Sequence, residues 1–186
     1  MISVRKYNPK DRENILKICI ETSGLPTETE KDKAFLNLMY NDYYAAVEGE
    51  NCFVAVNEAD EAVGYILCAE NYSKYSYTFR NLYLPEIKKL GFKYYSMAIS
   101  EMAVHSLFKK AYPAHLHIDI LPVCQGQGTG TELVNALKAH LKNKGVKGLM
   151  LSCGMGNKRA IKFYKKNQFR KLANIAGSCI MVFDLK

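Results

Sequence analysis

Three glycines within five residues, Gly126, Gly128 and Gly130, are the first feature of this sequence that could do chemistry. They follow an alternating apolar run at 115–120 that is typical of a strand, and they precede helical apolar spacing at 131–142. Glycine lets a backbone approach a ligand closely, and the first turn of a helix presents unpaired N–H groups at the positive end of its dipole. A strand, a glycine loop and a helix start therefore predict a site for an anion such as a diphosphate.

The spacing of this loop does not fit two common phosphate-binding motifs. A P-loop needs Lys-Ser or Lys-Thr after its last glycine, whereas Gly130 is followed by Thr131 and Glu132. A G-x-G-x-x-G dinucleotide loop needs its third glycine one residue later than it occurs here. The pattern Q/R-x-x-G-x-G/A does fit, through Gln125, Gly128 and Gly130. This pattern resembles the acyl-CoA signature of the GCN5-related N-acetyltransferases, the GNAT family.

A second stretch, 157–169, resembles the other signature of that family, N-x-x-A-x-x-F-Y followed closely by G-F. Asn157 and Tyr164 occupy its first and last positions, and Gln168 stands where glycine is usual. The two signatures have the separation found in the family and together cover about 116–169. The resemblance implies the GNAT fold and a GNAT-type acetyltransferase activity.

The resemblance also implies acetyl-CoA as co-substrate and assigns positions to its parts. The main chain of β-strand residues 118–120 would pair with the pantetheine arm, in a gap where two central parallel strands separate after Ile120. The backbone N–H groups of the loop would wrap the diphosphate. The expected cofactor-binding residues are Ile118, Asp119, Ile120, Gln125, Gly126, Gln127, Gly128, Thr129, Gly130, Thr131 and Asn157.

Tyr164 is the expected general acid. It lies seven residues after Asn157, close to two helical turns, so both side chains face the same way. The resemblance places that face beside the thioester, where Tyr164 would protonate the departing thiolate or hold its sulfur. A tyrosine pKa of about 10 suits a leaving group of similar basicity. The alternative is that the Phe163-Tyr164 pair only packs its helix.

The general base is less clearly marked. His115, His117 and Asp119 share one face of the expected strand and could relay a proton away from the amine. His117 and Asp119 are the candidate bases, and a hydrogen-bonded strand face without catalytic function is the alternative. The family often uses a carboxylate earlier on this strand, near the position of Ala114. Three glutamates are further candidates without a place: Glu70, Glu86 and Glu101.

The cysteines favour direct transfer over an acyl-enzyme. Cys124 and Cys153 have no His and Asn or Asp pattern around them that would mark a nucleophile. The six cysteines are scattered without C-x-x-C pairs, which predicts reduced thiols. No His, Asp or Glu cluster has metal-ligand spacing, so no metal is expected.

The rest of the chain predicts the scaffold. With 186 residues and 48% hydrophobic composition, we expect one domain over 1–186. The element order predicts an α/β fold, a GNAT-type mixed, twisted β-sheet with helices on both faces. The expected strands are 2–7, 52–56, 62–69, 115–120, 148–153, 169–172 and 179–185. Two helices are expected to begin at 9 and at 157. Four more are expected at 28–47, 85–90, 96–109 and 131–142.

A Tyr-rich segment at about 71–113 reads as a helical insertion before the central strand. The shortest members of the family pass almost directly from the hairpin at 52–69 to that strand. Aromatic side chains with polar tips can line a substrate site, but they also fill cores and subunit contacts. The sequence leaves both interpretations open.

Charge is divided unevenly along the chain, whose net charge is +8. Residues 133–186 carry 12 basic and one acidic side chain, whereas 1–132 carry 14 basic and 17 acidic ones. The basic half could attract the phosphates of coenzyme A, through residues such as Lys138, Lys142, Lys158, Arg159 and Lys162. A solvated surface is the alternative. Nucleic-acid binding rests on charge alone and is not favoured.

These observations define the expected function. The polar start and the lack of an apolar run of about 20 residues predict a soluble, cytoplasmic protein without a membrane partner. We expect an acetyl-CoA-dependent N-acetyltransferase that acts directly on an amine, either a small molecule or a peptide. The alternative is a catalytically silent GNAT-like module that binds acyl-CoA or a partner. A homodimer is possible, and the sequence does not name the acceptor.

Overall fold

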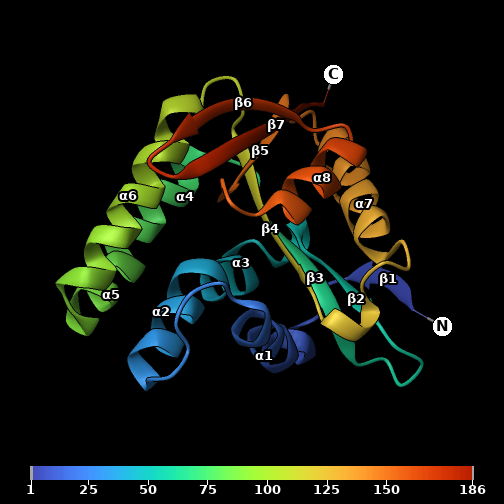
Figure 1. Cartoon of the computed structure of the whole chain (residues 1–186), viewed down its shortest axis with the longest axis horizontal. Helices are drawn as coiled ribbons and strands as arrows, with labels where there is room; N and C mark the ends of the chain where they lie inside the picture. The colour runs from blue at the N-terminus through green and yellow to red at the C-terminus, as the bar shows by residue number, and fades with distance from the viewer. Residues whose placement is uncertain (1, 186) are drawn as a thin grey trace.

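Seven strands form one mixed sheet in the computed structural model, which describes residues 2–185 (Figure 1). The strand order is β1-β2-β3-β4-β5-β7-β6, and only the central pair β4–β5 is parallel. The strands are β1 Ser3–Lys6, β2 Phe53–Val56, β3 Ala62–Ala69, β4 Ala114–Ile120, β5 Gly148–Gly154, β6 Arg170–Ile175 and β7 Ser178–Asp184.

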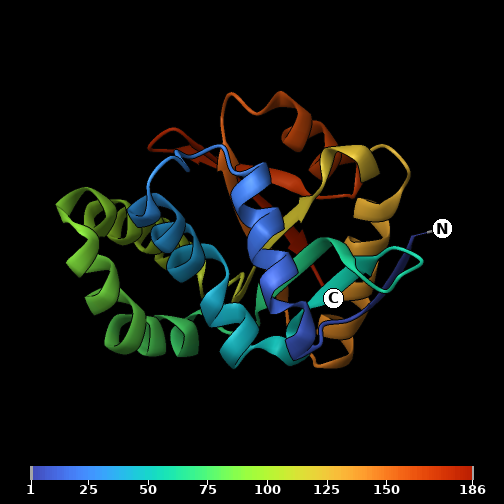
Figure 2. The same ribbon diagram turned by 90° about the horizontal axis from the view of Figure 1, so that it is seen from below.

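Helices cover both faces of the sheet, as the sequence predicts (Figures 1 and 2). Alternate residues of β3 divide between the two layers: Tyr65 and Leu67 pack under the N-terminal helices, and Ile66 packs under α7. The helices are α1 Arg12–Thr22, α2 Glu30–Tyr40, α3 Asp42–Val47, α4 Tyr72–Thr78, α5 Leu84–Leu90, α6 Phe92–Phe108, α7 Thr129–Asn143 and α8 Lys158–Lys166. Short turns of helix lie at Pro9–Asp11, Gly49–Asn51, Phe79–Tyr83 and Pro122–Cys124.

The structure corrects three of the expected elements. The helix expected at 28–47 is broken at Asn41, whose φ of −132° and ψ of −63° are not helical, so α2 and α3 are separate. Helix α4 was not expected, because its aromatic residues gave no clear apolar period. Strand β6 is longer than the expected 169–172 and β7 begins one residue before the expected 179, and the loop between them is only Ala176 and Gly177, both with positive φ, which is the geometry of a tight hairpin.

The central parallel strands separate earlier than expected. They pair only at Ala114 with Leu149 and at His115 with Met150, whereas β4 stays paired with β3 as far as Ile120. The expectation that they separate after Ile120 is therefore wrong. The gap extends over most of β4, which leaves a longer edge of the strand open to a ligand.

The Tyr-rich segment forms α4, α5 and α6, and most of its aromatic residues pack the core. Tyr72, Tyr75, Phe79 and Tyr83 are buried with the side chains of α1–α3. Phe92, in contrast, is 84% exposed. For the buried four, core packing accounts for the aromatic composition.

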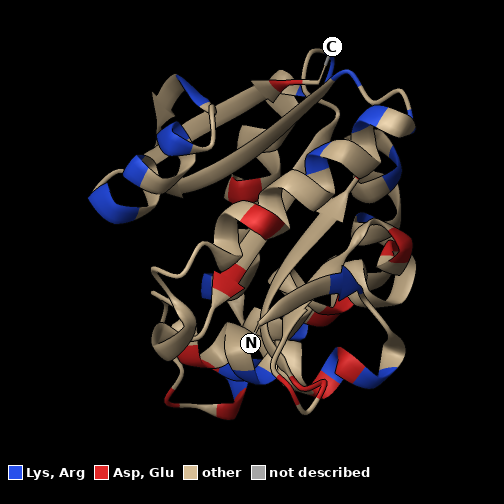
Figure 3. Ribbon diagram, turned by 90° about the vertical axis from the view of Figure 1, so that its right-hand side faces the viewer, with Lys and Arg blue, Asp and Glu red and all other residues tan. Residues whose placement is uncertain are grey.

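Charged residues are distributed as the sequence division suggests. In the upper part of Figure 3 they are mostly Lys and Arg, whereas both signs mix in the lower part. The basic last third of the chain supplies α8 and most of α7. Helices α7 and α8, which flank the glycine loop, therefore carry more basic than acidic side chains.

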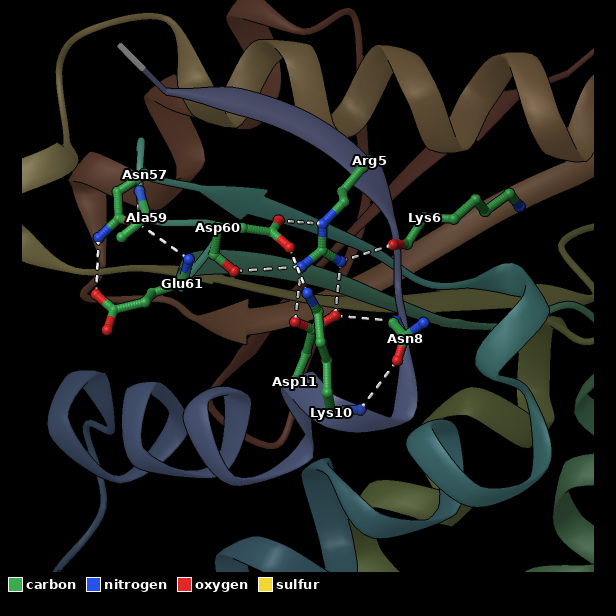
Figure 4. Close-up of polar contacts among 9 residues, drawn as sticks. All are labelled: Arg5, Lys6, Asn8, Lys10, Asp11, Asn57, Ala59, Asp60 and Glu61. Carbon is green, nitrogen blue, oxygen red and sulfur yellow. Dashed lines mark hydrogen bonds and ion pairs between the residues drawn. The ribbon is translucent and has the colours of Figure 1, made fainter.

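A polar network ties the first strand to the start of α1 and to the hairpin tip (Figure 4). Arg5 donates from two guanidinium nitrogens to Asp11, at 2.7 and 2.9 Å, and from Nε to Asp60 at 2.7 Å. Asp11 is 2% exposed and also accepts the N–H of Asn8. This bidentate, largely buried pair fixes how α1 leaves the sheet, and α1 is one wall of the cleft described below.

Gln168 adopts the backbone conformation that glycine usually provides at the end of this helix. Its φ is +65°, and Phe169 N–H bonds to Tyr164 C=O at 2.9 Å in a Schellman-type ending of α8. Gln168→Gly should stabilise the protein by about 0.5–1 kcal/mol, since it removes left-handed strain but adds chain entropy. Urea unfolding measures this. Lys166→Gly, in the last helical turn, should destabilise the protein instead. If both variants changed the free energy of unfolding in the same direction, Gln168 would not be a strained left-handed residue at the end of α8.

Candidate active site

A cleft of about 380 Å³ opens where β4 and β5 separate. Its walls come from the end of α1, from α2, from α6 and from the strand ends, and Tyr164 of α8 reaches it from the other layer. The polar and titratable groups that line it are Cys19, Ser23, Tyr40, Glu101, His117, Asp119, Ser152, Cys153, Tyr164 and Ser178.

The open edge of β4 is presented by alternate residues. Leu121 N–H bonds to Val63 C=O at 3.0 Å, so the peptide groups of Asp119 also face β3 and those of Ile118 and Ile120 face the gap. The peptide groups of Ile118 and Ile120 therefore face the gap, and their pairing with an extended ligand stays a prediction. Asp119 contributes its side chain to the cleft instead of its main chain. The Ile120 carbonyl already accepts the Gln125 amide at 2.6 Å.

The glycine loop fits a diphosphate. In the described chain, no protein acceptor bonds the N–H groups of residues 126–130, whereas Thr131 N–H is already bonded to Gly128 C=O at 2.8 Å. Gly126 and Gly128 have φ of +83° and +92°, and nothing lies within 4 Å of where their Cβ atoms would be. Consecutive free donors at the start of a 15-residue helix form a suitable anion cradle. Thr131 contributes less than expected because its N–H is used.

Gly130 has a packing function in the same loop. A Cβ there would lie 2.9 Å from the Phe163 ring and 3.2 Å from Ile120 Cδ1. Glycine at this position lets α7 and α8 approach closely beside the end of β4. This contact places the loop and Tyr164 at the same end of the gap.

Tyr164 and Asn157 hold different positions on α8. Tyr164 is 8% exposed, packs against Phe163 and Phe169, and lines the cleft. Burial, and then the nearby Asp119 carboxylate, raise the pKa of Tyr164 well above its usual value. Asn157 is exposed and caps the helix, accepting Ala160 N–H at 3.0 Å.

Asp119 is the titratable group best suited to take up a proton in the cleft. Its carboxylate accepts the Tyr65 hydroxyl at 2.6 Å, and burial raises its pKa to about 6. Burial instead lowers the pKa of His117 to about 3, and His117 Nε2 lies 2.9 Å from the Tyr44 hydroxyl. At neutral pH Asp119 is ionised and His117 is neutral, so the two candidate bases are not equivalent.

The sequence profile described as the acetyltransferase (GNAT) family matches residues 18–169. The chain belongs to this family. This confirms the resemblance on which the sequence motifs depended, and with it the assignment as a GNAT-type N-acetyltransferase.

Solved structures show the same GNAT fold over the whole chain. SsHAT is 27% identical, with a TM-score of 0.88, and the match covers 100% of this chain and 98% of that chain. The Drosophila melanogaster polyamine N-acetyltransferase, which forms N-acetylagmatine, is 15% identical with a TM-score of 0.67 and coverages of 99% and 100%. PaiA N-acetyltransferase from Thermoplasma acidophilum, in complex with coenzyme A, is 16% identical with a TM-score of 0.65 and 99% coverage of each chain.

In this GNAT protein only one of the three glutamates that the sequence left without a place lines the cleft. Glu101 of α6 lines the cleft and is 22% exposed. Glu86 pairs with Lys89 on the surface, and Glu70 pairs with Lys144, so neither belongs to the cleft. Sequence reasoning could name Glu101 but not place it, because its position depends on how α6 packs across the sheet.

Two further side chains differ from their expected positions. Lys138 lies under the Phe169 and Phe183 rings and donates to Asn167 C=O at 2.5 Å, and burial lowers its pKa to about 8. It is therefore part of the packing instead of the anion site. Arg159 does approach the loop, where its guanidinium bonds to Gln125 Oε1.

Other candidate chemistries have less support in this acetyltransferase. Burial raises the pKa of Cys153 to about 11, so its nucleophilic thiolate is disfavoured. Within residues 2–185, no three His, Cys, Asp or Glu side chains converge as a metal site would require. In the same part of the chain, every helix is too short or too polar to cross a bilayer.

Proposed function

We propose that this GNAT chain transfers the acetyl group of acetyl-CoA directly to the amine of a small cationic molecule. The observation that carries the proposal is a cleft lined by Asp119 of β4 and by the buried Tyr164, together with a row of free N–H groups in the loop that follows β4. The coenzyme A complex of a relative with the same fold supports the choice of co-substrate.

Acetyl-CoA, when bound, supplies the activated thioester. The N–H groups of 126–130 hold its diphosphate, and the peptide groups of Ile118 orient its extended arm in the strand gap. Asp119 then accepts the proton that the incoming ammonium must lose before its nitrogen attacks. The carboxylate can do this above about pH 6, where it is ionised.

The charge of the cleft favours a cationic acceptor. Asp119 and Glu101 both line it, and no Lys or Arg is among its lining residues, although the protein as a whole has a net charge of +8. Two carboxylates attract an amine that carries a second positive group. Relatives of the same fold that act on polyamines and agmatine are consistent with this class.

The direct test measures thiol release from acetyl-CoA with a panel of amines. We expect turnover with agmatine and polyamines, less with uncharged aryl monoamines, and little with acidic peptides. Coenzyme A binding without turnover on any amine would favour the silent-module alternative. If the folded protein bound no form of coenzyme A at millimolar concentration, both the proposed acetyltransferase and the silent acyl-CoA-binding module would be contradicted.

Tyr164→Phe should lower kcat about 10-fold. Its raised pKa makes full proton transfer to a thiolate unfavourable, so we expect Tyr164 to hold the sulfur by a hydrogen bond more than to protonate it. Steady-state kinetics with saturating acetyl-CoA measure the effect. Phe163→Leu, which alters the neighbouring ring but no hydroxyl, is the control for packing. An unchanged kcat for Tyr164→Phe would exclude the role.

Glu101→Gln should raise the KM for a dicationic amine about 10-fold, because one of the two cleft carboxylates is lost. The KM for acetyl-CoA and for a monoamine should change much less. Glu86→Gln makes the same chemical change on the surface of α5 and serves as the control. Equal effects of Glu101→Gln on monoamines and diamines would contradict recognition of a second charge.

A further inference from the structure

The Asp119 carboxylate is bound by a tyrosine of the neighbouring strand. Tyr65 of β3 lies directly opposite Asp119 of β4 in the strand register. Opposite residues of an antiparallel pair bring their side chains together on one face. The Tyr65 hydroxyl donates to Asp119 Oδ2 at 2.6 Å, and Tyr65 is fully buried. This distance is typical of a hydroxyl bonded to an ionised carboxylate.

The direction of this hydrogen bond follows from the charge of the two groups. The pKa of Asp119 is about 6, so at neutral pH its carboxylate is ionised and can only accept. Burial raises the pKa of Tyr65 well above its usual value, so the phenol keeps its proton. Cys19 of α1 also approaches the Tyr65 hydroxyl, and burial raises the pKa of this thiol to about 12. A neutral thiol is a weak acceptor, and the tyrosine proton therefore goes to the carboxylate.

A second hydroxyl near the carboxylate is already engaged. Thr22 of α1 approaches Asp119, but its hydroxyl donates to Ile18 C=O at 2.7 Å. A threonine hydroxyl has one proton, so in this arrangement Thr22 contributes less than Tyr65. Tyr65 is therefore the main donor to the carboxylate.

No cation among the described residues offsets the charge of Asp119 in the cleft, because neither Lys nor Arg lines it. Tyr164 of α8 also lies near Asp119, and burial raises its pKa, so it is neutral. The other titratable groups of the cleft are Tyr40 of α2, Glu101 of α6, Cys153 of β5 and His117 of β4. A buried carboxylate that lacks both a cation and a donor favours its protonated form. The hydrogen bond from Tyr65 opposes this tendency.

A neutral donor suits a base better than a cation does. At the hairpin tip, Lys10 and Arg5 lower the pKa of Asp60. A carboxylate of such low basicity takes a proton from an ammonium less readily. The Tyr65 hydroxyl stabilises the ionised form without a full charge, and the pKa of Asp119 stays above its usual 3.8. Asp119 is therefore both ionised at neutral pH and basic enough to accept a proton.

We propose that Tyr65 is a positioning residue of the acetyltransferase, whose hydroxyl binds Oδ2 of Asp119 and keeps the carboxylate ionised so that Oδ1 can receive the proton of the incoming amine. The inference rests on the proposed function, since it concerns Asp119 as the base. Tyr65 is buried and is not among the residues that line the cleft, so it acts through Asp119 and does not touch the amine.

The pH dependence of activity tests this role. Tyr65→Phe should move the acidic fall in kcat/KM for the amine upward by about one pH unit, from about pH 6 to about pH 7. The variant should be about 10-fold less active than the wild type at pH 5 and nearly equal to it at pH 8.5, where both carboxylates are ionised. The KM for acetyl-CoA should not change. An equal loss of activity at every pH would show only a structural role and would overturn the proposal.

Tyr94→Phe is the matched control for this variant. The Tyr94 hydroxyl donates to Asp32 Oδ1 at 2.8 Å, and neither residue lines the cleft. Loss of this hydroxyl should leave the pH profile unchanged. Thr22→Val should shift the profile less than Tyr65→Phe, because the Thr22 proton is bound by a backbone carbonyl. A larger shift for Thr22→Val would assign the role to Thr22 and overturn the proposal.

The carboxyl group can also be titrated without any turnover. Carboxyl ¹³C spectra of aspartate-labelled protein follow Asp119, whose signal is the one missing from Asp119→Asn. We expect a midpoint near pH 6 in the wild type and near pH 7 in Tyr65→Phe. An unchanged midpoint would overturn the proposal. If the wild type acetylates no amine, the proposed function fails, and this titration still decides whether Tyr65 controls the ionisation of Asp119.

A measurement that leaves Tyr65 in place covers the case in which Tyr65→Phe does not fold. The ¹³Cζ signal of a tyrosine that donates to Asp119 should move at the pH where the carboxyl group titrates. Tyr164→Phe removes the signal of the other tyrosine near Asp119. A tyrosine signal that still titrates with the carboxyl group in this variant would support the proposal, and the absence of any such signal would overturn it.

Discussion

Asp119→Asn should lower kcat/KM for the amine about 100-fold and at the same time stabilise the fold at neutral pH. The loss of activity follows because asparagine cannot accept a proton from the ammonium. In the wild type, kcat/KM should fall as the pH drops through about 6, where Asp119 becomes protonated. The residual activity of Asp119→Asn should not show this fall in kcat/KM at low pH.

The gain in stability follows from the sign of the pKa shift. The folded-state pKa of Asp119 is raised from 3.8 to about 6, so ionisation of this carboxylate opposes folding. Its contribution is most favourable below pH 3.8 and becomes a constant cost above pH 6, on the order of 1–2 kcal/mol after allowance for the open cleft. Asparagine removes that cost and can still accept the Tyr65 hydroxyl.

Urea unfolding at pH 5 and pH 7.5 tests this second part. The stabilisation by Asp119→Asn should be larger at the higher pH. Asp60→Asn makes the same substitution at the exposed hairpin tip, where ion pairs with Arg5 and Lys10 lower the carboxyl pKa, and it should not be stabilising. Full activity of Asp119→Asn would exclude Asp119 as the base and leave Glu101 as the cleft carboxylate to examine.

Gly128→Glu should weaken coenzyme A binding at least about 100-fold. The new carboxylate would lie beside the free N–H groups of 126–130 and repel the diphosphate. Gly128 also has a φ of +92°, so any side chain there adds backbone strain of about 1–2 kcal/mol. Isothermal titration with coenzyme A measures the affinity.

Gly145→Glu is a matched control for this variant. Gly145 lies just after the other end of α7, also has positive φ, and has nothing within 4 Å of its Cβ position. Both variants therefore gain the same charge and similar strain, and both should lose similar stability. Only Gly128→Glu should lose coenzyme A affinity. Equal affinities in the two variants would mean that the loop does not hold the diphosphate.

Local sequence patterns were sufficient for the fold and for the backbone conformation of the glycine loop. Alternating apolar residues at 115–120, positive-φ glycines at 126 and 128, and the cap and tyrosine of 157–164 each act over a few neighbours. Short-range patterns of this kind set backbone conformation directly. They therefore predicted the sheet, the loop and α8 before any contact was known.

The acceptor end was decided by packing between distant segments. Glu101 reaches the cleft because α6 packs across the sheet. The buried side chains of Tyr44, His105 and His115 also come together from three elements that are far apart in the chain. The early separation of β4 from β5 and the contact of Gly130 with Phe163 have the same origin. Burial also distinguishes the two candidate bases, because desolvation raises the pKa of the Asp119 carboxyl and lowers the pKa of the His117 imidazole. No pattern along the sequence contains that information, since it depends on which side chains exclude water from one another.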